Sequence, residues 1–470
     1  MTAKVPESTA DGAICVLNPA FLWLRHDEES VGFFQTSLQS VPVRRFSRRE
    51  TEILDCLATG MVQNEIVEKL DITPSELAKF LESLNFWGKD VVRWRHPAGS
   101  QAAMHQKRLR QAARLRDMAT AMTATVDAND IFHKTRLTEG NRQFDQIETT
   151  ISHMFREPHI ALDNRSYGEA FCDWLVANGR LKSPCRVIEI GCGLGFFANA
   201  IMDRLQMRYP DLYEGLSYTL FDLSPELQSA QKSNCGGHVE KTHFVSGNIE
   251  SHDFGDQQFD LVLSNEVIAD LNVATVSLDN VQRGSPQTDA ETVVHRYRLN
   301  CVPITQGNKK MAVINFGAIK MLENIAKCLA KNGYAVVTEY GTRKRSPKAV
   351  KLTNHYEYTI HFGQLEQVSQ HLGFQSDHGT MGDVIGFSAN CETIHMKTLR
   401  TLSTCLIPYL GREALPVLAY TPASLEAALG DIIARIGNLR FLRLDDRASF
   451  SPFRFELLSL SSGSANTRIA

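Results

Sequence analysis

The stretch Arg186-Val-Ile-Glu-Ile-Gly-Cys-Gly-Leu-Gly-Phe-Phe-Ala-Asn-Ala-Ile201 decides the fold of this chain. It opens with a short apolar run at 187–190, which has the composition of a buried strand. Three glycines alternate through positions 191–195, and residues 196–205 have the composition of a helix. Glycine lets a backbone approach a ligand closely, and the first turn of a helix offers unpaired N–H groups. The stretch therefore predicts a nucleotide-type cradle, with an ordinary strand-to-helix turn as the alternative.

The glycine spacing indicates which kind of ligand the cradle holds. The pattern is G-x-G-x-G, and Phe196 stands where the dinucleotide pattern G-x-G-x-x-G requires glycine or alanine. Glu189, two residues before the first glycine, places a carboxylate at the end of the strand. A carboxylate suits a ligand with an amino group and a sulfonium, and it repels a pyrophosphate. The stretch resembles motif I of class I S-adenosylmethionine (SAM) methyltransferases, which implies SAM as the cofactor.

Length, composition and charge narrow the remaining possibilities. A chain of 470 residues with 43% hydrophobic content predicts two or three domains with real cores, at about 100–200 residues each. A net charge of −3 gives no general reason to expect nucleic-acid or membrane binding. The ten cysteines are scattered without zinc spacing, so we expect reduced thiols, no metal and a cytoplasmic location. No apolar run approaches about 20 residues, and the N-terminus does not resemble a signal peptide.

The N-terminal 95 residues predict a small α+β domain. Residues 1–12 are expected to be disordered, and short strands are expected at 14–17, 21–26 and 31–35. Helices are expected at 48–59, 64–70 and 74–84. Two N-terminal signals support the first and third helices: Ser47 with Glu50 forms a capping box, and Thr73 precedes Pro74.

This order of elements is similar to winged-helix-like PqqD domains, which recognise peptides in the biosynthesis of ribosomally made and modified peptides. The resemblance implies that a leader peptide adds as a strand near 41–46, where Arg44 and Arg45 meet its acidic residues. Residues 46–84 also resemble a LuxR-type helix-turn-helix, but the third helix carries Glu76 and Glu82, and a DNA-reading helix is normally basic. A docking domain without any peptide ligand is the third option.

Residues 96–145 are expected to form a helical linker, because 100–123 contain neither glycine nor proline. Their basic stretch at 107–116 fits a solvated helix better than a binding patch. Residues 146–470 then form the methyltransferase domain. Its first loops contain His153, Arg156 and Tyr167, which form either a substrate wall or a set of packing contacts.

Polar residues follow three further strands of the expected parallel sheet. Asp222 follows 216–221, Asn248 follows 242–246, and Asn265-Glu266 follows 259–264. In an open α/β sheet, the carboxyl ends of the strands form the ligand edge. Asp222 is expected to bind ribose hydroxyls, and Asn248 is expected to bind adenine. The predicted cofactor-binding residues are Glu189, Gly191, Gly193, Gly195, Asp222, Leu223, Asn248, Ile249 and Asn265.

Two segments indicate which family of methyltransferases the chain resembles. Residues 217–231 and 263–273 resemble the MidA-like methyltransferases, a family that includes the mitochondrial complex I assembly-factor protein arginine methyltransferase. That family carries N-E-hydrophobic-hydrophobic-D-A-L-P-V after its fourth strand. This chain has Ala269 in place of the aspartate, Asp270 one position later, and Asn272 in place of the proline. The differences concern the substrate more than the cofactor.

The resemblance extends over about 145–460. Tyr340 lies in a segment like the family's D-Y-G strand end, with Glu339 replacing the aspartate, and His361 is in register with a family histidine. The implied fold is α/β, a Rossmann-like sheet of seven strands whose late antiparallel strand is at 453–458. Residues 278–306 are a polar insertion with a strand-like core at 292–300. It either contacts substrate or is a decorative hairpin.

These residues predict methyl transfer to a peptide or protein, with arginine as the favoured acceptor. A guanidinium is protonated at neutral pH and needs carboxylates to orient it. Carboxylate and backbone-amide methylation are weaker options. The rivals are a small-molecule or housekeeping-protein methyltransferase with a dimerising N-terminal domain, and a SAM-sensing regulator. The predicted catalytic residues are Glu266, Asp270, Glu339 and His361, with His153 as a second candidate base; the predicted substrate-binding residues are His153, Arg156, Tyr167, Tyr340, Arg44 and Arg45.

Overall fold

The computed structural model describes residues 14–27, 29–35, 40–84, 91–95, 150–306, 309–351 and 356–462. The predictions for residues 1–12 and for the linker 96–145 lie outside these ranges. The chain divides into two compact units: a small unit of Met1–Asp117 and Glu392–Ser449, and a large unit of Met118–Cys391 and Phe450–Ala470. In the described ranges, no helix has the length and apolar content needed to cross a membrane.

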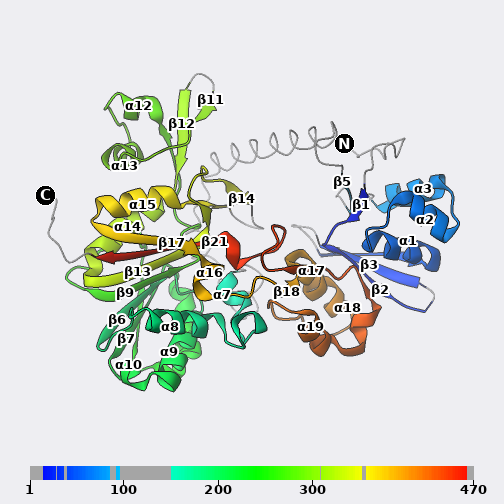
Figure 1. The fold of residues 1–470 in the computed structure, drawn as a ribbon, viewed down its shortest axis with the longest axis horizontal. Helices are drawn as coiled ribbons and strands as arrows, with labels where there is room; N and C mark the ends of the chain where they lie inside the picture. The colour runs from blue at the N-terminus through cyan, green and yellow to red at the C-terminus, as the bar shows by residue number, and fades with distance from the viewer. Residues whose placement is uncertain are drawn as a thin grey trace. The chain divides into compact units, whose positions relative to one another are not determined.

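The large unit contains the mostly parallel, Rossmann-like sheet expected from the sequence (Figure 1). Seven strands follow the order β17-β21-β13-β9-β6-β7-β8, and a two-residue strand, β16, pairs with the end of β13. Only β21 is antiparallel to its neighbours in this path. The strands are β6 (Cys185–Ile190), β7 (Leu216–Asp222), β8 (Thr242–Ser246), β9 (Phe259–Asn265), β13 (Leu329–Thr342), β16 (Ile360–His361), β17 (Phe374–Thr380) and β21 (Phe455–Ser462).

Helices cover both faces of this sheet, which explains why its central strands read as continuous apolar runs. In Figure 1, α14 and α15 lie on one face and α8, α9 and α10 on the other. The helices of the large unit are α7 (Ile151–Met154), α8 (Tyr167–Ala177), α9 (Phe196–Arg208), α10 (Pro210–Glu214), α11 (Gln228–Asn234), α14 (Phe316–Cys328), α15 (Phe362–His371) and α16 (Met381–Ile385). Short 3-10 turns occur at Ile160–Leu162, Pro225–Leu227, Gly236–His238 and Pro452–Arg454.

The chain reverses its direction of progress across the sheet beside β6. From β6 it moves outward to β7 and β8, and it then returns to β9 on the opposite side of β6. Such a switch point opens a crevice at the carboxyl ends of the strands, where open α/β sheets bind their ligands. Asp173 on α8 links this helix to α9, since Arg204 on α9 donates to its carboxylate at 2.7 and 2.8 Å.

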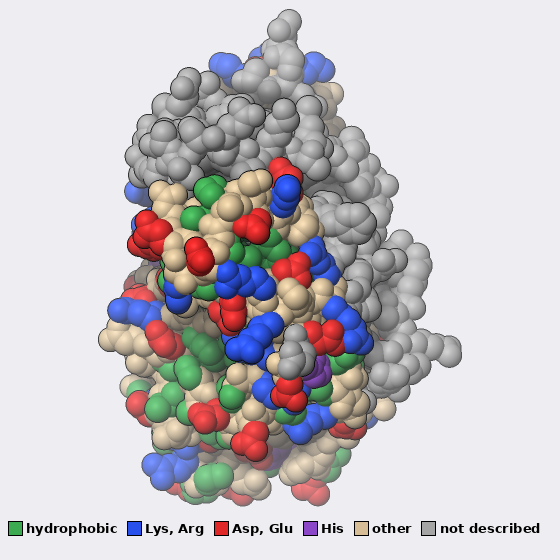
Figure 2. All heavy atoms as spheres, turned by 90° about the vertical axis from the view of Figure 1, so that its right-hand side faces the viewer, with side chains coloured by type: hydrophobic (Ala, Val, Ile, Leu, Met, Phe, Trp, Pro, Cys, Tyr) green, Lys and Arg blue, Asp and Glu red, His purple; other side chains and the backbone are tan. Residues whose placement is uncertain are grey.

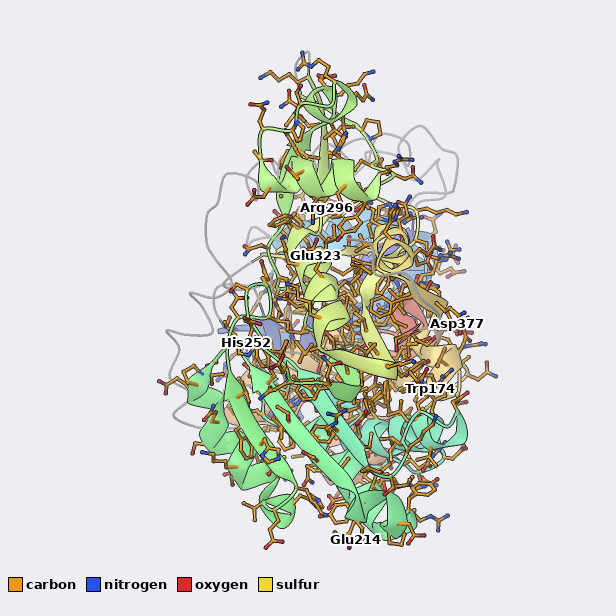
Figure 3. The ribbon with its side chains drawn as sticks, turned by 90° about the vertical axis from the view of Figure 1, so that its left-hand side faces the viewer. Trp174, Glu214, His252, Arg296, Glu323 and Asp377 are labelled. Atoms are coloured by element: carbon orange, nitrogen blue, oxygen red, sulfur yellow. The ribbon has the colours of Figure 1, made fainter. Side chains whose placement is uncertain are left out.

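The insertion after β9 differs from the expectation. It contains β10 (Ala274–Ser277), α12 (Leu278–Gln282), α13 (Asp289–Tyr297), β11 (Ile304–Gln306) and β12 (Lys309–Ile314), with the sheet order β10-β12-β11. The strand predicted at 292–300 is wrong, because most of it belongs to α13. Thr288 caps that helix, and Val293, Val294 and Tyr297 are buried at helical spacing. Figure 3 shows Arg296 on α13 beside Glu323 on α14, where their nitrogen and oxygen are 3.2 Å apart. Two short strands, β14 (Ala349–Lys351) and β15 (Tyr356–Tyr358), form a separate pair.

The N-terminal part of the small unit has the expected α+β composition. Its elements are β1 (Ile14–Leu17), β2 (Phe21–Arg25), β3 (Glu29–Gln35), β4 (Ser40–Ser47), α1 (Arg48–Ala58), α2 (Gln63–Leu70), α3 (Pro74–Leu84) and β5 (Val92–Arg95). Both predicted N-terminal signals are present: Ser47 and Glu50 form a capping box, and Glu76 N–H donates to Thr73 Oγ1 at 3.2 Å. β1 pairs with β5, and β2, β3 and β4 form a meander.

The small unit is discontinuous, which the expected boundary at 146–470 does not anticipate. The later segment supplies β18 (Glu392–Ile394), α17 (Met396–Thr401), a π-helical stretch at Leu402–Leu406, α18 (Ile407–Tyr409), α19 (Pro422–Leu429), a 3-10 turn at Gly430–Arg435, β19 (Ile436–Gly437) and β20 (Phe441–Arg443). β19 pairs with β2, so the sheet order is β19-β2-β3-β4. Asn438 Nδ2 donates to the carbonyls of Asn18 and Phe21, and Thr401 donates to that of Ala20.

Charges of both signs are interspersed on one face of the molecule. Figure 2 shows Lys and Arg side chains alternating with Asp and Glu across the described part of that face. Proteins that bind nucleic acids normally gather Lys and Arg into a basic patch. The described atoms of this face therefore give no support to a helix-turn-helix regulator.

A candidate cofactor site at the switch point of the sheet

A cavity opens in the large unit where β6, β7, β8 and β9 end. Most of the cofactor residues predicted from the sequence line it, together with residues at the start of α7 and in the loop after β9. The lining residues are Thr150, Ser152, His153, Glu189, Ile190, Gly191, Cys192, Gly193, Leu194, Phe196, Phe197, Phe221, Asp222, Leu223, Leu227, Gly247, Asn248, Ile249, Asn265, Glu266, Val267, Asp270 and Leu271.

The glycine loop has the backbone conformation that its sequence predicts. Gly191, Gly193 and Gly195 have φ angles of 72°, 52° and 82°, in the left-handed region that favours glycine. A Cβ atom at Gly191 would lie 2.4 Å from Cγ2 of Val267, so the turn also requires the absence of a side chain. Gly195 is the N-cap of α9 and does not line the cavity, so it shapes the loop from outside.

Asp222 ties the glycine loop to the end of β7. Its carboxylate accepts a hydrogen bond from Gly193 N–H at 2.9 Å and another from Ser224 N–H at 3.0 Å. A carboxylate can accept about four hydrogen bonds, so this anchoring is compatible with the predicted binding of ribose hydroxyls. On the next strand end, Asn248 Oδ1 accepts Glu250 N–H at 2.9 Å, and Ile249 is buried in the cavity wall.

Glu189 is the most deeply buried carboxylate of the lining. Its side chain accepts a hydrogen bond from the Tyr218 hydroxyl at 2.7 Å. The pKa of Glu189 is raised to about 8. Burial is the largest cause, the bond from Tyr218 opposes it, and the charge of Asp222 adds to it. Near neutral pH this carboxyl is therefore largely protonated until a cation approaches it.

A cationic ligand is expected to displace the proton of Glu189. SAM carries a sulfonium, which favours the ionised carboxylate, so binding releases a proton and the affinity rises as the pH approaches about 8. Titration calorimetry at pH 7 in buffers of different ionisation enthalpy measures this release. S-adenosylhomocysteine (SAH), which lacks the sulfonium, should release fewer protons. Equal proton release from the wild type and from Glu189→Gln would contradict the assignment.

Asn265 is the centre of a buried hydrogen-bond network. Its Oδ1 accepts bonds from the hydroxyls of Tyr167 and Thr338, both at 2.8 Å. Its Nδ2 donates to Ser152 Oγ at 3.0 Å and to Glu266 at 3.2 Å. Tyr167, a predicted substrate contact, is fully buried and does not line the cavity. Its hydroxyl instead holds the side chain of Asn265, which lines the cavity.

The four predicted catalytic residues separate into two groups. Glu266 and Asp270 line the cavity, whereas Glu339 and His361 do not. Glu339 accepts the backbone N–H groups of Ala269 and Tyr340, and burial together with the charge of Glu266 holds its pKa well above the usual value. His361 caps α15 by accepting Gln364 N–H, and burial lowers its pKa.

The predicted substrate residues are distributed over both units. His153 lines the cavity, and Arg156 lies over the Phe196 ring with 5.5 Å from its guanidinium carbon to the ring centroid. Tyr340 accepts a hydrogen bond from Arg454. Arg44 and Arg45 belong to the small unit. Each pairs with an acidic side chain of its own unit, Glu50 for Arg44 and Glu29 for Arg45.

Sequence reasoning missed two parts of the lining. Thr150 and Ser152 lie more than thirty positions before the glycine loop, and neither carries a motif. Val267 and Leu271 fall inside the family-like segment after β9, but as apolar residues they were not selected. The family-like segment was the available signal for the second pair. For Ser152 the signal was the loop rich in His and Arg that begins at this residue, and Thr150 had none.

The charges of the residues that line the cavity indicate which cofactor fits it. Four carboxyl groups, from Glu189, Asp222, Glu266 and Asp270, line the cavity, and the described lining residues include no lysine or arginine. Such a wall disfavours a pyrophosphate and suits the sulfonium and ammonium groups of SAM. Gly191 and Gly193 would hold the ligand through the backbone, Asp222 would meet the ribose, and Asn248 and Ile249 would meet the adenine.

The comparisons with known proteins agree with this fit. Residues 167–373 match the model of a family described as "Putative S-adenosyl-L-methionine-dependent methyltransferase". No curated protein matches the chain. SAM is accordingly the cofactor, as the matched family and the lining residues together indicate.

Several solved structures are similar to the chain at low identity. A protein of Burkholderia thailandensis bound to S-adenosyl-homocysteine is 15% identical, with 79% of this chain and 96% of that chain covered and a TM-score of 0.41. A phosphoethanolamine N-methyltransferase of Haemonchus contortus, in complex with phosphomonomethylethanolamine and S-adenosylhomocysteine, is 13% identical, with coverages of 73% and 61% and a TM-score of 0.37. A TehB-like SAM-dependent methyltransferase of Corynebacterium glutamicum is 17% identical, with coverages of 49% and 85% and a TM-score of 0.27.

Proposed function

We propose that this SAM-dependent methyltransferase methylates a cationic nitrogen of a peptide or protein, with arginine as the acceptor that its site suits best. The observation that carries the proposal is the charge of the cavity. Its described lining has four carboxyl groups and no lysine or arginine. A guanidinium entering beside a sulfonium needs such acidic groups, which ionise as the cations approach, because two cations otherwise repel each other.

The chemistry needs alignment more than acid–base power. SAM supplies a methyl group on a positively charged sulfur, and the acceptor nitrogen must approach the methyl carbon in line with the breaking bond. Asp270 lines the cavity, and we assign to it the orientation of the acceptor and the balance of its charge. Val267 and Leu271 supply an apolar wall on the same loop, which excludes water from the reacting atoms. The methylated nitrogen then loses its extra proton to solvent or to a neighbouring carboxylate.

The small unit offers one route for recruiting a peptide. β4 is the last strand in the order β19-β2-β3-β4, so an extended peptide can pair with its outer edge. Arg44 and Arg45 are less available to bind acidic residues of a peptide than the sequence suggests, because each is paired within the small unit. Arg44 Nη2 lies 2.6 Å from Glu50 Oε1, and Arg45 pairs with Glu29. Recognition by backbone hydrogen bonds is therefore the form of recruitment that we favour.

The same pairing favours one alternative. If the arginines only stabilise the small unit, that unit serves dimerisation or another structural role. The acceptor is then a small cationic molecule or a housekeeping protein.

Mass spectrometry of the intact product tests the proposal. We expect the full chain with SAM to add one or more methyl masses to arginine-containing peptides, and not to the same peptides with citrulline, which has the shape of arginine without its charge. Asp270→Asn should reduce this rate by roughly 100-fold while leaving the affinity for SAH near that of the wild type. Equal methylation of the citrulline peptides would overturn the cationic acceptor. Methylation of small amines alone would favour the alternative.

A further inference from the structure

One wall of the SAM cavity comes from a segment that no motif marks. Thr150, Ser152 and His153 line the cavity, and they lie at the start of α7. α7 is a single turn, so its own hydrogen bonds hold it weakly. The position of this wall must therefore be set by contacts from elsewhere in the fold.

Glu266 supplies two of these contacts. One carboxylate oxygen accepts Ile151 N–H at 2.7 Å, and the other accepts Ser152 N–H at 3.0 Å. The two amides belong to the first turn of α7, where helix N–H groups lack partners within the helix. Both oxygens of Glu266 are therefore engaged with the backbone of the wall.

The backbone of Glu266 is in an unfavourable conformation. Its φ is 56°, in the left-handed region, where asparagine or glycine is accommodated more easily. Its N–H donates to the carbonyl of Thr338 at 3.0 Å, which ties this conformation to β13. Strained residues persist where the surrounding structure determines them, and they gather at functional sites. A glutamate here has the reach to engage both amides, which asparagine and glycine do not have.

Asn265, next to Glu266, holds one side chain of this wall, that of Ser152. Asn265 Nδ2 donates to Ser152 Oγ at 3.0 Å and to Glu266 at 3.2 Å. Asn265 is itself held by hydroxyls from α8 and β13, those of Tyr167 and Thr338. The end of β9 thus binds the wall segment through both its backbone amides and a side chain.

We propose that Glu266 is a positioning residue that clamps residues 150–154 as a wall of the SAM cavity, so that cofactor affinity depends on this carboxylate. The role differs from an orienting contact with the methyl acceptor. It explains why a glutamate tolerates a left-handed backbone directly after β9. In this role Glu266 acts together with the adjacent Asn265, and both residues attach the wall to the sheet.

The test compares Glu266→Gln with Glu291→Gln in the full chain. Glutamine keeps the size of glutamate but loses the charge, and its amide nitrogen cannot accept a backbone N–H. Glu291 is a matched control, since it also accepts two backbone amides, from Ser277 at 3.0 Å and Gln287 at 2.7 Å, but it lies in the insertion. SAH affinity is measured by calorimetry, which needs no methyl acceptor. Failure of the proposed acceptor therefore leaves this test unaffected.

We expect Glu266→Gln to weaken SAH binding by roughly tenfold or more, and Glu291→Gln to leave it unchanged. Hydrogen exchange at the amides of Ile151 and Ser152 should become faster in Glu266→Gln. Wild-type affinity would overturn the proposal. Weaker binding with unchanged exchange at both amides would also overturn it, because Glu266 would then act on the ligand directly.

A second variant separates positioning from stability. Glu266→Asn adopts the left-handed backbone more readily but does not reach both amides. We expect its thermal midpoint to equal or exceed that of the wild type while SAH binding is weakened. A lower midpoint with wild-type affinity would mean that Glu266 serves only the stability of the fold.

Discussion

Replacing Gly191 with alanine is expected to raise the Kd for SAH by about 100-fold or more, which corresponds to about 2.7 kcal/mol. Two effects combine. The φ of 72° is strained for any residue with a side chain, and the new Cβ would stand 2.4 Å from Cγ2 of Val267. Both Gly191 and Val267 line the cavity, so either the glycine turn or the loop after β9 must move. Calorimetry of the folded variant measures the loss.

Gly179→Ala is the matched control for this prediction. Gly179 also has a positive φ, 62°, but a Cβ there would meet nothing within 4 Å. Its substitution imposes a similar backbone penalty without a collision, so we expect a small loss of stability and wild-type SAH affinity. If both variants lose affinity equally, backbone strain rather than the shape of the cavity is responsible, and the site assignment loses its support.

The second large effect concerns the small unit. Residues 1–95 expressed alone are expected to show no cooperative unfolding transition, whereas 1–95 joined by a flexible linker to 392–449 should show one. The fully buried Trp23 on β2 explains the difference, because β19 lies directly against its indole. Asn438 and Thr401 from the later segment also satisfy buried carbonyls of residues 18–21. Without that segment, the apolar surface and the carbonyls around β2 lose their partners.

Thermal denaturation followed by circular dichroism distinguishes the fragment 1–95 from the linked protein. A point variant tests the same contact in the full chain: a Cβ at Gly437 would lie 1.9 Å from the Trp23 ring, so Gly437→Ala should unfold the small unit at lower temperature. Faster hydrogen exchange in β2 and β19 reports this loss. A stable 1–95 fragment with a sharp transition would show that the small unit does not need its later segment.

The parts of the fold that could be predicted are those coded by neighbouring residues. The glycine loop, the strand before it and α9 follow one another within the single stretch 186–208, so composition and spacing suffice. Asp222 and Asn265 each end an apolar strand, Asn248 follows β8 by two residues, and parallel strands bring those ends to one edge. The capping box at Ser47 is likewise local, since its partner Glu50 is three residues away.

The parts that could not be predicted depend on contacts between distant residues. The wall at 150–154 is held by Glu266, more than a hundred positions later, and no pattern links them. The segment 392–449 completes a sheet that begins near residue 20. The sequence predicts a strand in place of α13 because its threonine and valines favour strands, whereas tertiary packing and the Thr288 cap favour a helix.

The predicted chemistry of single residues also depended on these distant contacts. The sequence shows Glu266 and Glu339 only as two carboxylates near strand ends. The structure shows that Glu266 accepts the amides of Ile151 and Ser152, and that Glu339 accepts those of Ala269 and Tyr340. Which of several acidic residues faces a ligand is determined by these backbone partners, and their positions come from packing.

The most direct test of the central claim, that this cavity holds SAM, is photo-crosslinking of methyl-labelled SAM to the full chain, with the labelled peptides located by mass spectrometry. The cavity predicts label in the peptides that carry residues 150–154, 189–197 or 247–249, and loss of that label when excess SAH is present. Label confined to other peptides, or label that excess SAH does not displace, would contradict the claim.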